Sequence, residues 1–129
     1  PYTIIGRVVN GYHEGRKMGF PTANIDISHF GQLIPAPGVY AVKARMENTV
    51  AWKRGMMNIG TRPTFNGKQT TLETHIFNFD GDIYDQLLLV SFVKRMRGER
   101  KFDTPDELAD QLREDEETVL QLFEHNSEK

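Results

Sequence analysis

Residues 38–46 read Gly-Val-Tyr-Ala-Val-Lys-Ala-Arg-Met, and this stretch decides the fold. The apolar side chains on one face of it are Tyr40, Val42, Ala44 and Met46. The charged side chains Lys43 and Arg45 fall on the other face. Alternation with a period of two predicts a β-strand that turns one face to a core and the other to water.

Further runs of strand-like composition lie on both sides of this stretch. They cover residues 4–9, 50–59, 71–79 and 87–95. Turn-forming sequences separate them: Pro-Ala-Pro-Gly at 35–38, Asn-Gly at 66–67 and Asp-Gly at 80–81. Short strands joined in this way usually form an antiparallel sheet that closes, because closure removes exposed edges. We therefore predict a mainly β fold, a barrel over about residues 1–102.

The hydrophobic period changes in the C-terminal part of the chain. Thr104 can cap a helix, Pro105 suits the first helical position, and Glu107 completes a capping box. Apolar residues follow at helical spacing and are Leu108, Leu112, Val119 and Phe123, backed by Leu120 and Leu122. This pattern predicts one helix over about residues 105–124, with its apolar face on the barrel and its acids in water.

Length and composition favour one domain over residues 1–129, with 38% hydrophobic and 26% charged residues. No apolar run approaches the roughly 20 residues needed to cross a bilayer, and residues 1–5 carry neither a basic leader nor the hydrophobic core of a signal peptide. The chain has no cysteine, which excludes disulfides, thiolate metal sites and a cysteine nucleophile. We expect a cytoplasmic protein. Pro1 stands where a start methionine would, so we expect a processed chain or a piece of a longer one.

The net charge of −2 conceals a division along the chain. Residues 1–102 carry 14 basic and 8 acidic residues, whereas residues 103–129 carry 2 basic and 10 acidic residues. A basic body can attract an anionic ligand such as a nucleotide, although solvated surface charge explains the same counts. The bases lack the aromatic interleaving of a nucleic-acid surface, so we predict no nucleic-acid partner.

A glycine-rich segment, Gly-Tyr-His-Glu-Gly-Arg-Lys-Met-Gly, covers residues 11–19. Its glycines Gly11, Gly15 and Gly19 permit a loop whose backbone N–H groups converge on an anion. Arg16 and Lys17 add positive charge to that loop. It matches neither a Walker loop nor a Gly-x-Gly-x-x-Gly fingerprint, so an ordinary hairpin remains an alternative.

The loop is followed by Phe20-Pro21-Thr22-Ala23-Asn24. In an extended segment, residues two apart share a face, so Thr22 and Asn24 can offer two neutral oxygens to one cation. Mg²⁺ prefers oxygen ligands and usually completes its shell with phosphate and water. The alternative is a turn in which these side chains bond their own backbone.

A second polar cluster lies in the run at 71–79. Alternation places Glu73, His75, Phe77 and Phe79 on one face of the expected strand. A carboxylate and an imidazole beside aromatic rings can be shielded from water and tuned for proton transfer. A barrel strand with polar residues at its rim is the structural alternative.

Taken together, these segments resemble the riboflavin kinase family. The matching elements follow the family's order and are the Gly11–Gly19 loop, Pro21-Thr22-Ala23-Asn24, Pro37-Gly38-Val39-Tyr40, Asn58-Ile59-Gly60, Glu73-Thr74-His75-Ile76-Phe77 and Arg97-Gly98-Glu99-Arg100-Lys101-Phe102. They spread across nearly the whole chain. Pro-Thr-Ala-Asn is highly specific, and its pairing with Glu-x-His-Ile-Phe is more so.

The resemblance implies a six-stranded antiparallel Greek-key barrel with a C-terminal helix, and a reaction that converts ATP and riboflavin to FMN and ADP. By motif position, Glu73 would be the base that takes the proton from the riboflavin 5′-hydroxyl. Thr22 and Asn24 would assist Mg²⁺ and phosphate binding. The residues that would surround ATP are Gly11, Gly15, Arg16, Lys17 and Gly19, with His75 close to it. Those on the flavin side would be Arg97, Glu99 and Phe102.

The resemblance also bears on partners. In bacteria such a domain commonly forms the C-terminal half of a bifunctional FAD synthetase, whose N-terminal half adenylylates FMN. Pro1-Tyr2-x-Ile4-x-Gly6 resembles the junction at which the kinase half begins. We expect an excised kinase domain that forms no FAD by itself.

Two alternatives from other classes remain. A non-catalytic flavin- or nucleotide-binding barrel would keep the basic loop and the flavin segment but would lack the base. An oligonucleotide-binding barrel would need exposed stacking aromatics, which Phe77 and Phe79 could supply only if they face outward.

Overall fold

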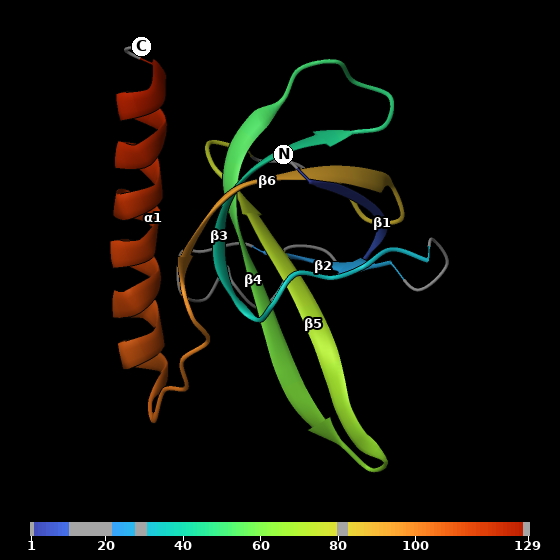
Figure 1. Ribbon diagram of the computed structural model, residues 1–129, viewed down its shortest axis with the longest axis vertical. Helices are drawn as coiled ribbons and strands as arrows, with labels where there is room; N and C mark the ends of the chain where they lie inside the picture. Colours follow the sequence, from blue (N-terminus) through green and yellow to red (C-terminus); the bar gives the residue numbers. More distant parts are fainter. Residues whose placement is uncertain (1, 11–21, 28–30, 80–82, 128–129) are drawn as a thin grey trace.

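The computed structural model is a closed barrel of six β-strands with one helix beside it (Figure 1). The structure describes residues 2–10, 22–27, 31–79 and 83–127. Its elements are β1 (Thr3–Asn10), β2 (Ala23–Asp26), β3 (Gly38–Met46), β4 (Lys53–Thr64), β5 (Gly67–Ile76), β6 (Leu87–Arg97) and α1 (Pro105–Ser127). The predicted mainly β barrel with a C-terminal helix is confirmed.

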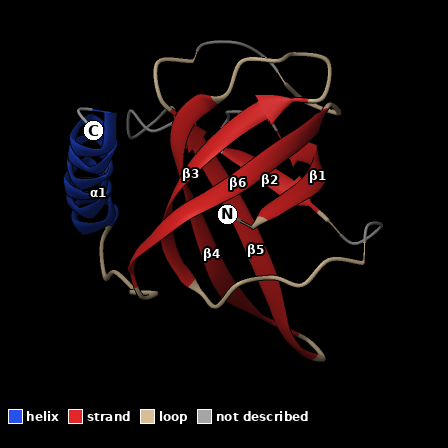
Figure 2. Cartoon of the chain, turned by 45° about the horizontal axis from the view of Figure 1, so that its top comes forward, coloured by secondary structure: helices blue, strands red, loops and turns tan. Residues whose placement is uncertain are grey.

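The strands close in the order β1-β2-β5-β4-β3-β6, and every neighbouring pair is antiparallel. β3, β4 and β5 form a meander of consecutive neighbours (Figure 2). The connections from β2 to β3 and from β5 to β6 join strands that are not neighbours. This is the Greek-key connectivity that the family resemblance implied.

Strand β2 is only four residues long, and the sequence pattern did not predict it. It pairs with β1 through Arg7↔Asp26 and Val8↔Ile25, and with β5 through Ala23↔Thr74 and Asn24↔Glu73. Alanine, asparagine and aspartate are poor strand formers, so local propensity gave no signal. Both neighbouring strands supply partners, and this tertiary context makes the segment a strand.

The β4–β5 hairpin is longer than predicted and projects beyond the rest of the barrel (Figure 1). Its last rung is Thr64↔Gly67, so Phe65 and Asn66 form the loop. The predicted turn at Asn66 and Gly67 therefore lies at the hairpin tip. Gly67 has φ of 144°, a conformation that side chains rarely adopt. The predicted turn at residues 80–81 lies outside the described residues.

The barrel interior is one apolar cluster built from alternate residues of the strands. The side chains predicted to face it from β3 all do so: Tyr40, Val42, Ala44 and Met46. The Tyr40 ring meets Phe92 edge-on, with ring centroids 5.1 Å apart. Leu88 and Val90 from β6 are fully buried in the same cluster.

A second apolar cluster lies outside the barrel, where α1 covers it. Ala41 of β3, Met56 of β4 and Phe77, just after β5, pack there with Val119 and Phe123 of the helix. The helix begins at the predicted residue, Pro105, and ends at Ser127 rather than near residue 124. Within the described ranges, no helix is both long enough and apolar enough to cross a membrane.

Half of the predicted capping box forms at the start of α1. The backbone N–H of Glu107 donates to Thr104 Oγ1 at 3.2 Å. The Glu107 carboxylate reaches back and accepts from the Asp103 backbone N–H, also at 3.2 Å. The first bond satisfies a donor that the first turn of a helix leaves free. The second reaches one residue beyond the Thr104 N–H that a full capping box would bind, and it holds the chain just before the helix.

The prediction that Phe79 shares a face with Glu73, His75 and Phe77 is wrong. β5 ends at Ile76, and Asn78 has φ of 54°. This left-handed residue breaks the alternation of the strand. Phe77 consequently packs in the cluster under α1, whereas Phe79 packs against the interior cluster.

Thr74 offers a test of packing in the interior. Its side chain is fully buried, and its hydroxyl has no hydrogen-bond partner among the described residues. Burying an unpaired polar group costs about 1–3 kcal/mol. We predict that Thr74→Val raises the free energy of unfolding by about 1 kcal/mol in urea denaturation. Thr70→Val, at an exposed position of the same strand, serves as the control, and a decrease for Thr74→Val would contradict the prediction.

Candidate active site

The barrel's interior packing places Thr22 and Asn24 on the outside. Ala23, between them, is fully buried and belongs to the interior cluster. Asn24 therefore points outward from β2, and Thr22, just before the strand, flanks Ala23 from the other side. Both side chains are half-buried. The two predicted oxygen donors thus lie next to each other along the same short segment.

Glu73 lies directly across from Asn24. The register pairs Asn24 of β2 with Glu73 of β5, and Glu73 with Asn58 of β4. Leu72 and Thr74 on either side of Glu73 are buried, so the half-buried Glu73 side chain points outward. Opposite residues have Cβ atoms about 4.5–5.5 Å apart. A carboxylate therefore stands between two carboxamides on the outer face of the barrel.

His75 lies on the same face of β5 but is covered by α1. It is 8% exposed, and its Nε2 is 3.6 Å from Glu116 Oε2 of the helix. Its ring meets Phe77 edge-on at 5.4 Å between centroids. The predicted contact of His75 with ATP stays a prediction. The predicted ATP loop also stays a prediction, because its residues Gly11, Gly15, Arg16, Lys17 and Gly19 lie outside the described residues.

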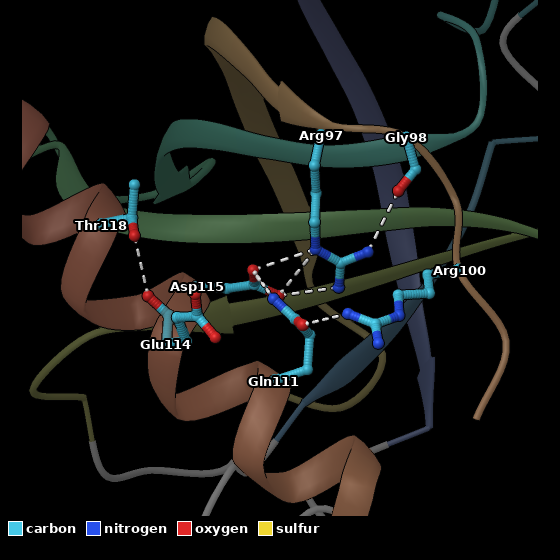
Figure 3. A network of polar contacts seen from close by, with 7 residues as sticks. All are labelled: Arg97, Gly98, Arg100, Gln111, Glu114, Asp115 and Thr118. Carbon is cyan, nitrogen blue, oxygen red and sulfur yellow. Dashed lines mark hydrogen bonds and ion pairs between the residues drawn. The ribbon is translucent and has the colours of Figure 1, made fainter. Parts of the chain in front are cut away.

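Arg97, at the end of β6, is bound to the helix (Figure 3). Its Nε donates to Asp115 Oδ1 at 2.9 Å and its Nη2 to Asp115 Oδ2 at 2.7 Å. Its Nη1 donates to the Gly98 carbonyl at 3.0 Å. These bonds occupy all three guanidinium nitrogens of Arg97. Its predicted contact with the flavin stays a prediction.

Asp115 corrects the expectation that the acids of the helix face water. It is only 6% exposed, because the guanidinium of Arg97 and the amide of Gln111 bind its carboxylate. A buried carboxylate needs such partners. Helical spacing places residue 115 between Leu112 and Val119 on the apolar face, and this was the signal in the sequence that could have identified it.

The same network holds the segment between β6 and α1. Arg100 Nη1 donates to Gln111 Oε1 at 2.7 Å, and Gln111 in turn donates to Asp115 (Figure 3). The Arg100 guanidinium also lies over the ring of Phe102, 5.3 Å from its centroid. The segment that carries the predicted flavin residues is therefore fixed to the helix at Arg97 and Arg100.

Glu99 turns from this segment towards β4. The Thr61 backbone N–H donates to Glu99 Oε2 at 2.8 Å, and the Thr61 hydroxyl lies 3.2 Å from Oε1. A Cβ on Gly60 would lie 3.2 Å from Glu99 Oε2 and 3.1 Å from Thr71 Oγ1. Because Gly60 has no side chain, the Glu99 carboxylate and the Thr71 hydroxyl can approach this strand closely. Gly60 lies two residues along β4 from Asn58, on the same outer face.

An open groove of about 620 Å³ begins beside Asn24. The β2–β5 register ends at Asn24↔Glu73, and the groove is lined by residues of both strands beyond that point. Apolar side chains such as Ile25 and Ile27 line it together with polar ones such as Gln69 and Thr71. Its volume is within the range of small-molecule sites. The groove thus opens between β2 and β5, next to the Asn24–Glu73 pair, and residues of the interior cluster such as Leu72 form part of its lining.

The family model described as Flavokinase: Riboflavin kinase matches residues 1–123, and the chain belongs to the riboflavin kinase family. The bifunctional riboflavin kinase/FMN adenylyltransferase of Haemophilus influenzae is 44% identical over 123 residues. These residues are 95% of this chain and 39% of that protein. The chain therefore spans about two fifths of the length of the curated relative.

Two solved structures have a similar fold. One, described as a macrolide-efflux protein from Streptococcus pneumoniae, superposes with a TM-score of 0.82 and 38% identity, over 92% of this chain and 38% of that one. The other is riboflavin kinase from Trypanosoma brucei, with a TM-score of 0.63 and 17% identity, over 95% of this chain and 79% of that one. At that identity the second likeness shows the fold alone.

The Arg97–Asp115 pair gives a stability prediction. We expect Asp115→Ala to lower the free energy of unfolding by about 2–3 kcal/mol, because it leaves a partly buried guanidinium unpaired. Asp110→Ala is the matched control, since Asp110 pairs with Arg113 on the exposed side of α1 and its loss should cost no more than about 0.5 kcal/mol. Chemical denaturation of both variants measures the difference. Equal losses would show that the buried pair contributes no more than a surface pair.

Proposed function

We propose that this domain transfers the γ-phosphate of ATP to the 5′-hydroxyl of riboflavin, giving FMN and ADP. The observation that carries the proposal is Glu73, an outward carboxylate held in register between Asn24 and Asn58. Membership of the riboflavin kinase family supplies the substrate class. The groove that begins beside Asn24 supplies room for a ligand next to this row of residues.

Glu73 acts as the general base in this proposal. The 5′-oxygen of riboflavin attacks the γ-phosphorus while the bond from that phosphorus to the β–γ bridging oxygen breaks. ADP leaves with the bridging oxygen, and the hydroxyl proton passes to the Glu73 carboxylate. Phosphoryl transfer depends mainly on alignment and on neutralising charge. The base therefore has only to orient and deprotonate a primary alcohol, a contribution of about 10²–10⁴ in rate.

Thr22 and Asn24 fit a magnesium ion brought with ATP. They offer a hydroxyl and a carboxamide oxygen on either side of the buried Ala23, and Mg²⁺ accepts neutral oxygens together with phosphate and water. The ion would neutralise phosphate charge there. Asn24 is also the residue opposite Glu73, so the donor set adjoins the proposed base.

The remaining ligand contacts follow the family motifs. We assign the ATP side to Gly11, Gly15, Arg16, Lys17 and Gly19, with His75 near the nucleotide. We propose that Glu99 and Phe102 contact the flavin. Arg97, at the start of the same segment, also lies on the flavin side in this proposal. The positions of the flavin-side residues support their assignment. Glu99 lies against β4 beside Gly60, and Arg97 and Arg100 fix the segment to α1.

The alternatives have less support. A non-catalytic barrel has no need for a carboxylate in register with two amides at this face. A barrel that stacks oligonucleotide bases needs exposed aromatics, but Phe77 is 7% exposed beneath α1 and Phe79 packs against the interior cluster. We propose riboflavin and Mg-ATP as the ligands, and an FMN adenylyltransferase domain as the natural partner in a longer protein.

The base assignment predicts a large loss of turnover. Glu73→Gln keeps the shape of the side chain but removes the basic carboxylate, so FMN formation should fall by about 10²-fold or more while riboflavin still binds. The rate of FMN formation is measured by chromatography after incubation with riboflavin, ATP and Mg²⁺. Glu47→Gln, at an exposed residue after β3, should be unaffected. If Glu73→Gln kept more than about a tenth of the rate, Glu73 would not be the base.

The magnesium assignment predicts a defect on the nucleotide side. Thr22→Ala and Asn24→Ala each remove one oxygen donor, so KM for Mg-ATP should rise by about tenfold while riboflavin binding is retained. Steady-state kinetics over a series of Mg²⁺, ATP and riboflavin concentrations separate the effect on Mg-ATP from an effect on riboflavin. Asn48→Ala, in the exposed turn after β3, is the control. An unchanged Mg²⁺ dependence in both variants would remove Thr22 and Asn24 from the metal site.

A further inference from the structure

Asn58 begins the motif Asn58-Ile59-Gly60, which resembles the family but has no function assigned to it above. We propose that Asn58 is a specificity-determining residue that binds a secondary hydroxyl of the ribityl chain while the terminal hydroxyl meets Glu73. This inference rests on the proposed riboflavin kinase activity. In this proposal, the Asn58 carboxamide binds the ribityl chain, the polyol that joins the flavin ring to the reacting 5′-oxygen.

The order of residues across the barrel surface carries the inference. Asn24 on β2, with the proposed metal donors, lies on one side of Glu73, and Asn58 on β4 lies on the other. The proposed flavin segment reaches the same strand further along, where Glu99 binds the Thr61 backbone N–H. A substrate whose ring lies at that segment and whose terminal hydroxyl lies at Glu73 runs along the outer faces of β4 and β5, where Asn58 on β4 and Thr71 on β5 are the neighbouring polar side chains.

The surroundings of Asn58 direct its side chain to a ligand. Its partner on β3 is Val39, which is 2% exposed, and its neighbour on the outer face of β4 is Met56, which is 5% exposed. The other neighbour, Gly60, has no side chain. Asn58 is exposed, and its carboxamide makes no hydrogen bond with the described residues, whereas the carboxylate of Glu99 next to Gly60 binds Thr61.

The chemistry of the carboxamide suits a hydroxyl group. It presents an N–H donor and an oxygen acceptor, and a hydroxyl both donates and accepts. Side chains opposite each other on neighbouring strands lie about 5 Å apart at Cβ, a separation that a polyol of a few carbons spans. Asn58 and Glu73 can therefore bind hydroxyls of the same chain.

The test crosses a variant of Asn58 with a change in the substrate. Asn58→Val removes the amide while its β-branch favours a strand. The two substrates are riboflavin and a flavin whose N10 chain is 5-hydroxypentyl, which keeps the terminal hydroxyl and lacks the secondary ones. For riboflavin, Asn58→Val should lower kcat/KM about tenfold, because one hydrogen bond to the substrate is lost. For the hydroxypentyl flavin, wild type and variant should react equally.

Controls separate this inference from the function on which it rests. Lys43→Val, an exposed change on β3, should leave both substrates unaffected, and Asn58→Ala should reproduce Asn58→Val if the valine variant folds poorly. An equal loss for both substrates, or no loss for riboflavin, would overturn the role of Asn58. Failure of the wild type to phosphorylate either flavin would instead overturn the proposed kinase activity.

Discussion

The barrel closes through two residue pairs between β2 and β5, Ala23↔Thr74 and Asn24↔Glu73, and the outer surface depends on them. The first pair faces the interior, where Ala23 and Thr74 are fully buried. The second pair therefore faces outward. A slip of one residue would move every side chain of β2 to the opposite face, burying Asn24 and exposing Ala23. Packing inside the barrel thus fixes which polar groups meet outside it.

The helix supplies the second constraint on this surface. The basic body and acidic tail, which the sequence showed as a division of charge, meet where Asp115 binds Arg97 and where Glu116 lies against His75. Some of the basic residues therefore serve the fold as well as any anionic ligand, because Arg97 and Arg100 bind α1 and hold the segment before it. Glu99 extends from that fixed segment to β4, so the position of the helix and the shape of the proposed flavin site are linked.

Strong periodic signals made much of the fold predictable. Alternation in residues 38–46 identified the interior face of β3, and Thr104, Pro105 and Glu107 identified the start of α1. The four residues of β2 were missed because their strand conformation depends on partners far away in the chain. For the same reason, motifs indicated Asn24 and Glu73 separately, but only the register showed that they are opposite each other and that Asn58 completes the row. Asp115 was missed because an acidic helix was expected to turn all its acids to water.

The most direct measurement is a crystal structure of the domain with riboflavin, Mg²⁺ and a non-hydrolysable ATP analogue. We expect the riboflavin 5′-oxygen within about 2.6–3.2 Å of the Glu73 carboxylate, on the outer face of the barrel between Asn24 and Asn58. A complex in which the 5′-oxygen points to the γ-phosphate but lies beyond reach of Glu73, with another group at hydrogen-bond distance, would contradict it.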